Sequence, residues 1–300
     1  MNRIPFLHLI LTYTRPLVLT IIFPLLFICP GCSTGPHQPS ERQQIAIESN
    51  QRAENAYKKR NYIKALNHYM EALNISRSLE NADSMGSNIV NIAYVYYRMG
   101  EREKSHTYAD LIINKNPFEY SVRYLIDAMS IKALLYCDES NGKEASFWAD
   151  KALNLCQGVS CREEGRIYNI RARASLLNKD IKAATEYAKK GLEINKKIDD
   201  VAEMGNSMRI MADIELMNKN YEASRGLYKD ALLIDKSLEL SDKMINDLLG
   251  IAVTFEKQGR PNEALPYYRR AISISEGMGN MEMEKSIREK IEKMQPQKNP

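Results

Sequence analysis

The histidines and cysteines are the residues of this 300-residue chain best suited to metal binding or nucleophilic chemistry. His8, His37, His68 and His106 lie far apart in the sequence, and no two have the spacing that a zinc site needs. The sequence contains no glycine-rich phosphate loop and no serine in a nucleophile elbow. We therefore expect no catalytic residues, no metal site and no small-molecule cofactor.

Cys156 and Cys161 flank a short segment that contains Gly158. In an oxidising compartment this segment could turn back and let the two cysteines form a small disulfide loop. The alternative is a pair of free thiols at a helix end, and the sequence leaves both possibilities open. Cys137 is expected inside a helix, where it would be packed or would face a groove.

The overall charge gives little reason to expect a nucleic-acid partner. The formal net charge is +4, with 44% hydrophobic and 27% charged residues, which is ordinary for a globular protein. No basic stripe with interleaved aromatic residues occurs, although such stripes are typical of proteins that bind RNA or DNA. The chemistry of this chain should therefore lie in how its elements present side chains to a partner.

The N-terminus has the features of a targeting segment. Arg3 and Arg15 supply positive charge, and an apolar run over residues 17–29 follows. That run is shorter than the roughly 20 residues that a membrane-spanning helix needs, but it suits the core of a signal peptide. We therefore predict a signal peptide over residues 1–31 and a flexible tether within residues 32–42.

The residues after this run, Cys29-Pro30-Gly31-Cys32-Ser33, resemble the processing site of bacterial lipoprotein precursors. The resemblance implies cleavage before Cys32 and attachment of acyl chains, such as palmitate, to that residue. Several acyl chains give a stable membrane anchor. Ser33 is not the aspartate that marks retention at the inner membrane, so the resemblance favours an outer-membrane lipoprotein of the cell envelope that faces the periplasm.

The alternative is an uncleaved, tilted anchor that begins near Leu7. It would place Arg15 inside the membrane, and an arginine at that depth is costly.

Small and aliphatic residues recur about every 40 residues through the rest of the chain. The first column is Ala53, Ala93, Ala133, Ala172, Ala212 and Ala252. The second is Ala65, Ser105, Ala145, Ala184, Ser224 and Ala264, and the third is Leu73, Ile113, Leu153, Leu192, Leu232 and Ile272. Small residues at matched positions let two antiparallel helices approach closely. Polar turns such as Asn141-Gly142 separate the two helices of each repeat.

These columns resemble the tetratricopeptide repeat family, most closely over residues 61–73 and 259–272. The resemblance implies an all-α fold, a right-handed α-solenoid of six helical hairpins over residues 43–280 with a C-terminal capping helix and tail over 281–300. The expected repeats are 46–85, 86–125, 126–164, 165–204, 205–244 and 245–280. Because the standard period is about 34 residues, we expect a longer second helix and a longer linker in each repeat. Kinesin light chains and Gram-positive peptide sensors have similar arrays.

In this family the first helix of each repeat lines a concave groove that holds the ligand. The resemblance therefore implies two partner-binding clusters, Tyr57, Tyr94 and Tyr97 in the first two repeats and Arg166, Asn169, Arg173, Asn206 and Arg209 in the fourth and fifth. Arginine forks suit carboxylates and asparagines suit peptide backbone. For the first cluster, the alternative is that the tyrosines pack between repeats. For the second, it is a solvated charged face with local ion pairs, such as Arg209 with Asp213 one turn away.

The leading functional hypothesis is a membrane-anchored, non-catalytic scaffold that binds a protein or peptide partner in this groove. Outer-membrane lipoproteins of this type assist pilus assembly, secretion or the organisation of cell-wall enzymes. The alternative is a peptide-sensing regulatory module whose superhelix changes pitch when it binds a short peptide. An enzyme is the third class, and the motifs argue against it.

Overall fold

The computed structural model describes residues 38–114 and 119–294. The chain divides into two units, residues 1–39 and 40–300, and every helix described belongs to the second. The predicted signal peptide, Cys32 and the first part of the predicted tether lie outside the described residues, as do residues 295–300 of the predicted tail. None of the helices in the described ranges is long and apolar enough to cross a membrane.

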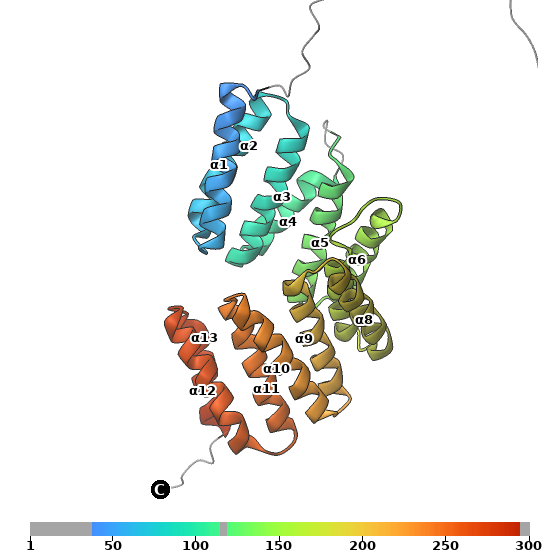
Figure 1. Cartoon of the computed structure of the whole chain (residues 1–300), viewed down its shortest axis with the longest axis vertical. Helices are drawn as coiled ribbons and strands as arrows, with labels where there is room; N and C mark the ends of the chain where they lie inside the picture. Colours follow the sequence, from blue (N-terminus) through green and yellow to red (C-terminus); the bar gives the residue numbers. More distant parts are fainter. Residues whose placement is uncertain (1–37, 115–118, 295–300) are drawn as a thin grey trace, which may run out of the picture. The chain divides into compact units, whose positions relative to one another are not determined.

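The described part of the second unit consists of helices joined by short turns, and it contains no strand (Figure 1). The first six helices are α1 (Glu41–Lys58), α2 (Tyr62–Ser78), α3 (Ala82–Met99), α4 (Arg102–Ile113), α5 (Val122–Asp138) and α6 (Gly142–Cys156). The others are α7 (Glu164–Leu177), α8 (Ile181–Lys197), α9 (Val201–Met217), α10 (Tyr221–Ser237), α11 (Ser241–Lys257), α12 (Pro261–Gly277) and α13 (Met281–Met294). Helices α1 to α12 form six hairpins and α13 packs on α12, which confirms the predicted all-α solenoid.

The small-residue columns lie where the two helices of each hairpin meet. All twelve residues of the first two columns have no exposed surface. The hydroxyl of Ser105 donates a hydrogen bond to the carbonyl oxygen of Ala93 at 2.8 Å, and that of Ser224 does the same to Ala212 at 2.8 Å. A serine of the second column therefore bonds directly to an alanine of the first, because no larger side chain holds the helices apart.

The 40-residue period has a different structural origin from the expected longer second helix and longer linker. Helices α8 and α9 each have 17 residues, and turns of three residues follow them. Two such helices with their turns account for the 40-residue period, so both helices are lengthened and the expected long linker is wrong for these repeats. These turns are tight because their middle residues, Asp199 and Lys219, have a left-handed backbone. Asp200 then caps α9 by accepting a hydrogen bond from the backbone N–H of Glu203.

The predicted repeat boundaries are also too late. Helix α1 begins at Glu41, inside the predicted tether of residues 32–42, and the expected boundary at 126 falls inside α5. The alanine columns mark the middle of the first helix but not its start. The start is set by capping: the Ser40 hydroxyl accepts a bond from the Gln43 backbone N–H, and the Ser40 N–H donates to the Gln43 side chain at 2.8 Å.

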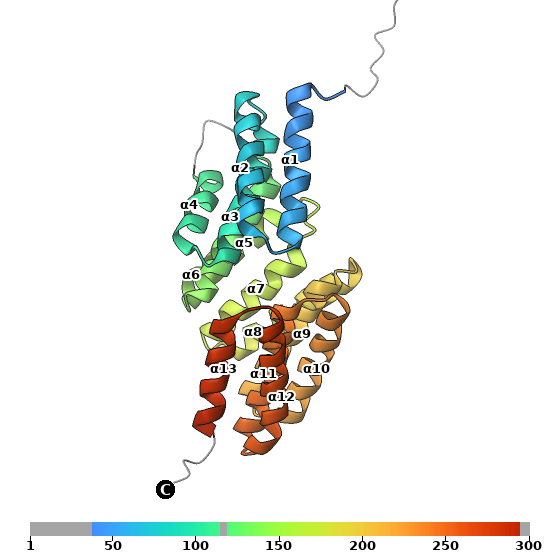
Figure 2. The same cartoon turned by 90° about the vertical axis from the view of Figure 1, so that its left-hand side faces the viewer.

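The hairpins stack in two layers. The first helices of successive hairpins, α3, α5, α7, α9 and α11, pack next to one another, whereas the second helices have no comparable contact with each other in the described residues. The array therefore curves with α3 to α11 on its inner side (Figures 1 and 2). We call the odd-numbered helices α1 to α11 the inner helices.

One carboxylate links the two ends of the curved array. Asp242, at the start of α11, accepts a bond from Arg60 Nη1 at 2.9 Å through Oδ1 and one from Arg98 Nη2 at 3.1 Å through Oδ2. Arg60 follows α1 and Arg98 lies at the end of α3, so this contact joins the first two hairpins to the sixth. We call it the Asp242 latch.

Candidate functional site

All six inner helices contribute side chains to one cavity of about 630 Å³. Its wall runs from Tyr57 of α1 to Asn246 of α11, and no second helix of a hairpin contributes a lining residue in the described part of the chain. The geometry follows from the repeat, because each first helix turns the same face toward the inside of the curve. The cavity is within the size range of sites that hold small ligands or short segments.

The structure brings the two predicted clusters together. Every predicted partner-binding residue lines this cavity: Tyr57, Tyr94, Tyr97, Arg166, Asn169, Arg173, Asn206 and Arg209. They come from four helices, α1, α3, α7 and α9. The sequence placed them in two separate parts of the groove, but curvature makes these parts opposite walls of the same space.

The arginines of the cavity are bound to carboxylates of neighbouring repeats. Arg166 Nη2 donates to Asp127 at 2.9 Å and Arg166 Nη1 donates to the Tyr94 hydroxyl at 3.1 Å. Arg173 Nη2 donates to Asp138 at 2.6 Å. These acidic partners lie on α5, the preceding inner helix, so ion pairs connect one repeat to the next along the inner layer.

Arg209 has the most buried partners. Its Nε donates to Asp247 at 2.7 Å and its Nη2 donates to Asp235, and both aspartate side chains are fully buried. Burial raises the pKa of Asp247 to about 7, although Arg209 opposes the shift. The expected pairing of Arg209 with Asp213 is wrong. Asp213 instead accepts a hydrogen bond from the Tyr228 hydroxyl, because Arg209 reaches α10 and α11 rather than its own next turn.

The two asparagines differ in what they can offer a ligand. Asn169 is buried; its Nδ2 donates to the Glu203 carboxylate at 2.9 Å, and its Oδ1 accepts a bond from the Ser207 hydroxyl at 2.7 Å. Asn206 accepts a bond from Arg209 at 2.9 Å through its oxygen, and its amide nitrogen has no hydrogen bond within the described ranges. Asn206 can therefore donate to a ligand, whereas Asn169 mainly joins α7 to α9.

The tyrosines form an aromatic wall. The rings of Tyr94 and Tyr97 meet edge to face with centroids 6.0 Å apart, and both side chains are half-buried. Burial raises the pKa of Tyr57 to about 12 and also raises that of Tyr97, so both hydroxyls are neutral hydrogen-bond donors at physiological pH. These tyrosines can thus pack against the core and line the cavity at the same time.

Besides Asp138, three further polar residues of the cavity did not stand out in the sequence. Glu203 lies on α9, and Lys243 and Asn246 lie on α11. Lys243 is the third residue of α11 and lies before residue 245, where the sixth repeat was expected to begin. Only the observed start of α11 at Ser241 places it on the cavity wall.

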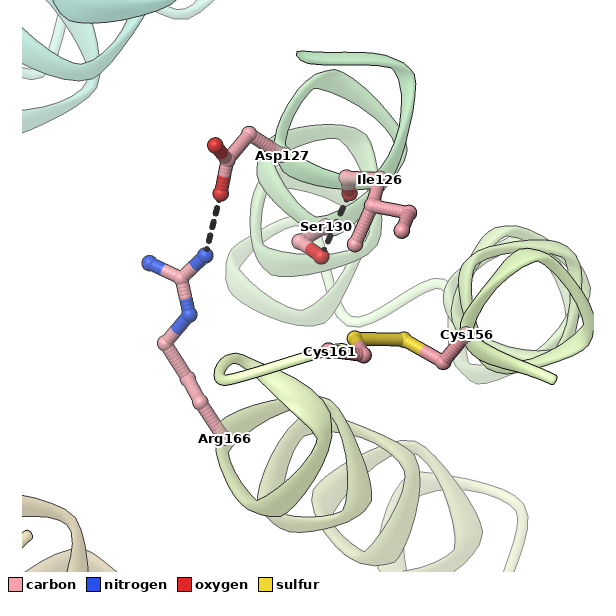
Figure 3. The surroundings of a disulfide bond; sticks show 6 residues. All are labelled: Ile126, Asp127, Ser130, Cys156, Cys161 and Arg166. Atoms are coloured by element: carbon pink, nitrogen blue, oxygen red, sulfur yellow. Dashed lines mark hydrogen bonds and ion pairs between the residues drawn. A yellow bond between two sulfur atoms is a disulfide. The ribbon is translucent and has the colours of Figure 1, made fainter. Parts of the chain in front are cut away.

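Cys156 and Cys161 form a disulfide with Cα atoms 5.2 Å apart. It ties the end of α6 to the segment that leads into α7 (Figure 3). On the other side of that junction, Arg166 reaches from α7 to Asp127 on α5. Cys137 is a buried free thiol, and burial raises its pKa to about 11.

No group of His, Cys, Asp or Glu side chains in residues 38–114 and 119–294 is arranged to hold a metal ion.

Comparisons with known proteins identify the repeat. Residues 203–277 match the sequence model of the tetratricopeptide repeat family. The fold is similar to that of apo RapI, with a TM-score of 0.65, 16% identity, and coverage of 81% of this chain and 87% of RapI. A comparison of the sequence with curated proteins gave no match.

Two other solved structures have the same fold. A Rap protein complexed with Competence and Sporulation Factor gives a TM-score of 0.60 at 15% identity, covering 83% of this chain and 74% of that protein. PilF of Pseudomonas aeruginosa gives 0.50 at 14% identity, covering 83% and 99%. Residues 203–277 therefore match tetratricopeptide repeats, and the described helices between residues 41 and 294 have the same fold as these solved structures.

Proposed function

We propose that this protein is a membrane-anchored, non-catalytic scaffold that binds a short segment of a protein or peptide partner in the cavity of the inner helices. The observation that carries the proposal is the convergence of all eight predicted partner-binding residues on that one cavity. Its volume of about 630 Å³ suits an extended segment rather than a folded domain.

The cavity wall has the composition of a peptide-binding surface. Tyrosines provide flat apolar area at a low entropic cost, and their hydroxyls can bond to a peptide backbone. Asn206 adds a free amide donor. The arginines keep the wall rigid through their ion pairs, which lowers the entropy lost on binding.

Photocrosslinking in the native cell tests this proposal. A benzophenone amino acid replaces Tyr57, on the cavity wall, and in a second variant replaces Leu233, whose side chain lies on α10 outside the cavity and is 67% exposed. We expect a discrete crosslinked partner from position 57 only. Equal products from both positions, or none from position 57, would contradict binding in the cavity.

A matched substitution checks that the crosslink depends on the wall. Asn206→Leu removes the free amide donor and keeps a similar side-chain volume. It should weaken capture from position 57 while leaving the fold intact. Substituting Arg209 is a poor test, because it would leave two buried carboxylates without a positively charged partner.

The anchor is a separate part of the proposal. We propose that Cys32 is lipidated and that the solenoid faces the periplasm from the outer membrane. The Gly31-Cys32-Ser33 sequence supports it. Cys32→Ser should release the protein from the membrane fraction, whereas full retention would favour the uncleaved anchor.

A peptide-sensing module is the second candidate, and the Asp242 latch favours it. The latch joins the second and sixth hairpins through Arg98, which also lines the cavity. A segment that engages Arg98 would therefore compete with Asp242 and could change the curvature of the array. The solved Rap protein in complex with Competence and Sporulation Factor has the same fold.

A further inference from the structure

The connection from α6 to α7 differs from the tight turns that lead into α3 and α9. It runs over residues 157–163, whereas the turns before α3 and α9 have three residues each. Asn81 and Asp200 cap those two helices by accepting bonds from backbone N–H groups of the first turn, at 2.9 Å and 3.0 Å. The first turn of α7 has no side-chain cap in the described ranges. Its start therefore lacks the bond that fixes the start of α3 and α9.

The segment of residues 157–163 is itself weakly held. The two backbone bonds that tie it to the end of α6 are 3.3 Å long. The exposed side chains of Ser160 and Arg162 make no hydrogen bond and no ion pair within the described residues. The Cys156–Cys161 disulfide closes the segment covalently. Because a short loop restricts the unfolded chain less than a long one, this disulfide acts mainly on the junction of α6 and α7.

The disulfide lies beside an ion pair of the cavity wall. Ile126 of α5 belongs to the same apolar cluster as the two cysteines, and the next residue, Asp127, accepts a bond from Arg166 at 2.9 Å. Figure 3 shows the disulfide at the entry into α7 and Arg166 on the first turn of that helix, reaching toward α5. The disulfide thus contacts both elements that this ion pair connects.

The bonds of Arg166 depend on the position of the first turn of α7. Arg166 also donates to the Tyr94 hydroxyl at 3.1 Å, so one guanidinium joins α7 to α3 and α5. The side chains of Arg166 and Asp127 are only 21% and 26% exposed, so water can replace a lost partner poorly. A shift of the helix start would therefore move Arg166 and Tyr94 on the cavity wall together.

We propose that the Cys156–Cys161 disulfide places the cavity of the inner helices under redox control. In the oxidised protein it holds the first turn of α7, so that Arg166 joins α3 to α5. Reduction releases this turn, loosens the wall around Tyr94 and weakens partner binding. The effect on binding rests on the proposed function, whereas the change in the wall does not.

The reductant is a dithiol. One of its thiolates attacks the sulfur of Cys161, which is partly exposed, whereas Cys156 is 7% exposed. The disulfide bond breaks, Cys156 leaves as a thiolate and takes up a proton, and a mixed disulfide remains on Cys161. The second thiol of the reductant resolves it, so two electrons and two protons pass to the cysteines and the dithiol becomes a disulfide. Cys137 does not compete, because burial raises its pKa to about 11 and keeps it protonated.

Hydrogen–deuterium exchange of the purified protein tests the local effect. The oxidised protein is compared with the same protein in dithiothreitol, which is the dithiol probe. Backbone amides of residues 167–169, near the start of α7, should exchange about fivefold faster after reduction, as after loss of a helix cap. The control is residues 204–206 at the start of α9, where the Asp200 cap is independent of the disulfide and exchange should stay unchanged.

Fluorine nuclear magnetic resonance reads the cavity wall directly. 3-Fluorotyrosine at position 94 places a probe on the ring whose hydroxyl accepts from Arg166, and at position 268 it places one on a buried ring of α12. Reduction should shift the signal of position 94 and leave that of position 268 unchanged. Cys156→Ser with Cys161→Ser should give the signal of the reduced protein, and dithiothreitol should not change it further.

Partner capture tests the consequence for binding. The benzophenone at position 57 should yield less crosslinked partner in the native cell when the chain also carries Cys156→Ser and Cys161→Ser. The matched control is Gln157→Ala with Ser160→Ala, which alters the same exposed segment and keeps the disulfide. It should capture as much partner as the chain with the benzophenone alone.

The outcomes separate the redox control from the proposed function. Unchanged exchange over residues 167–169 after reduction would contradict the inference, and so would faster exchange throughout the array, because the disulfide would then stabilise the whole fold. Equal capture by the double serine variant would overturn the redox control of binding and leave the proposed function standing. If reduction changes α7 and position 94 but position 57 captures nothing in any variant, control of the wall stands and the proposed function fails.

Discussion

Arg209 is the cavity arginine whose substitution should disturb folding most. Its partners Asp235 and Asp247 have fully buried side chains, so Arg209→Met would leave two carboxylates without a counter-charge. Breaking such a buried pair costs about 3–5 kcal/mol. Urea denaturation should show that loss. Arg173→Met is the control: its side chain is 42% exposed, and the expected loss is below about 1 kcal/mol. Equal losses for both variants would contradict this account.

Asp247 should make stability depend on pH. Burial raises its pKa from 3.8 to about 7 in the folded chain. Between these values the folded chain keeps a proton that the unfolded chain has lost, so this group lowers the free energy of unfolding as the pH rises through that range. Burial also raises the pKa of Asp213, so this group too lowers the free energy of unfolding as the pH rises.

Asp247→Asn removes the titrating group and keeps the shape. The free energy of unfolding of this variant, measured from about pH 5 to pH 8, should fall less with rising pH than that of the unsubstituted protein. Asp230→Asn, on the exposed face of α10, should leave the slope unchanged. Parallel slopes for Asp247→Asn and the unsubstituted protein would show that Asp247 is ionised throughout.

The residues of the cavity were only partly predictable. Tyr57 and Arg166 follow from the repeat register, because every first helix turns the same face inward. The partners of Arg209 do not follow, since Asp235 and Asp247 lie on other helices and aspartates are usually exposed. Lys243 lies before residue 245, the expected start of the sixth repeat. The absence of a hydrogen-bond or ion-pair partner for its side chain in the described residues becomes visible only once the neighbouring helices are placed.

At the scale of the helices, close packing of α10 on α11 depends on one glycine. A Cβ atom at Gly250 would lie 2.4 Å from the ring of Tyr228, whose hydroxyl is bonded to Asp213 and cannot move freely. Gly250→Ala should therefore destabilise the protein by about 1–3 kcal/mol, the usual cost of overpacking. Thermal or urea denaturation measures the change.

Gly226 gives a matched control on α10. A Cβ atom there meets nothing within 4 Å, so Gly226→Ala should stabilise the helix by up to about 1 kcal/mol through propensity alone. The two substitutions are chemically identical and should have opposite signs. A stabilising Gly250→Ala would mean that α10 and α11 can separate without loss.

The helices themselves were predictable where small residues recur, but their ends were not. Fully buried Ala53 and Ala65 mark the two helices of the first hairpin. The end of the tether depends instead on Ser40 and Gln43, a capping pair that a 40-residue column does not reveal. Period and hairpin count therefore come from packing residues, whereas boundaries come from caps and turns.

At the scale of the whole array, closure depends on weak contacts. The stacking of inner helices fixes the curvature from one repeat to the next, but in the described residues only the Asp242 latch joins the first hairpin to the sixth by hydrogen bonds or ion pairs. The side chains of Arg60, Arg98 and Asp242 are 37%, 35% and 38% exposed. Pairs this exposed contribute about 0.2–1 kcal/mol each and are screened by salt.

Asp242→Asn should therefore open the array without unfolding it. Spin labels at Ile63 on α2 and Leu233 on α10, both exposed, allow the distance distribution between the first and fifth hairpins to be measured by electron paramagnetic resonance. We expect a longer and broader distribution for Asp242→Asn, and the same change for the unsubstituted protein at high salt.

Glu239→Gln is the control. It removes a nearby exposed charge that makes no ion pair in the described part, and it should leave the distribution unchanged. Because both latch arginines would lose their shared partner, high salt should have little further effect on Asp242→Asn. A distribution that responds to neither salt nor Asp242→Asn would mean that helix stacking alone holds the ends together.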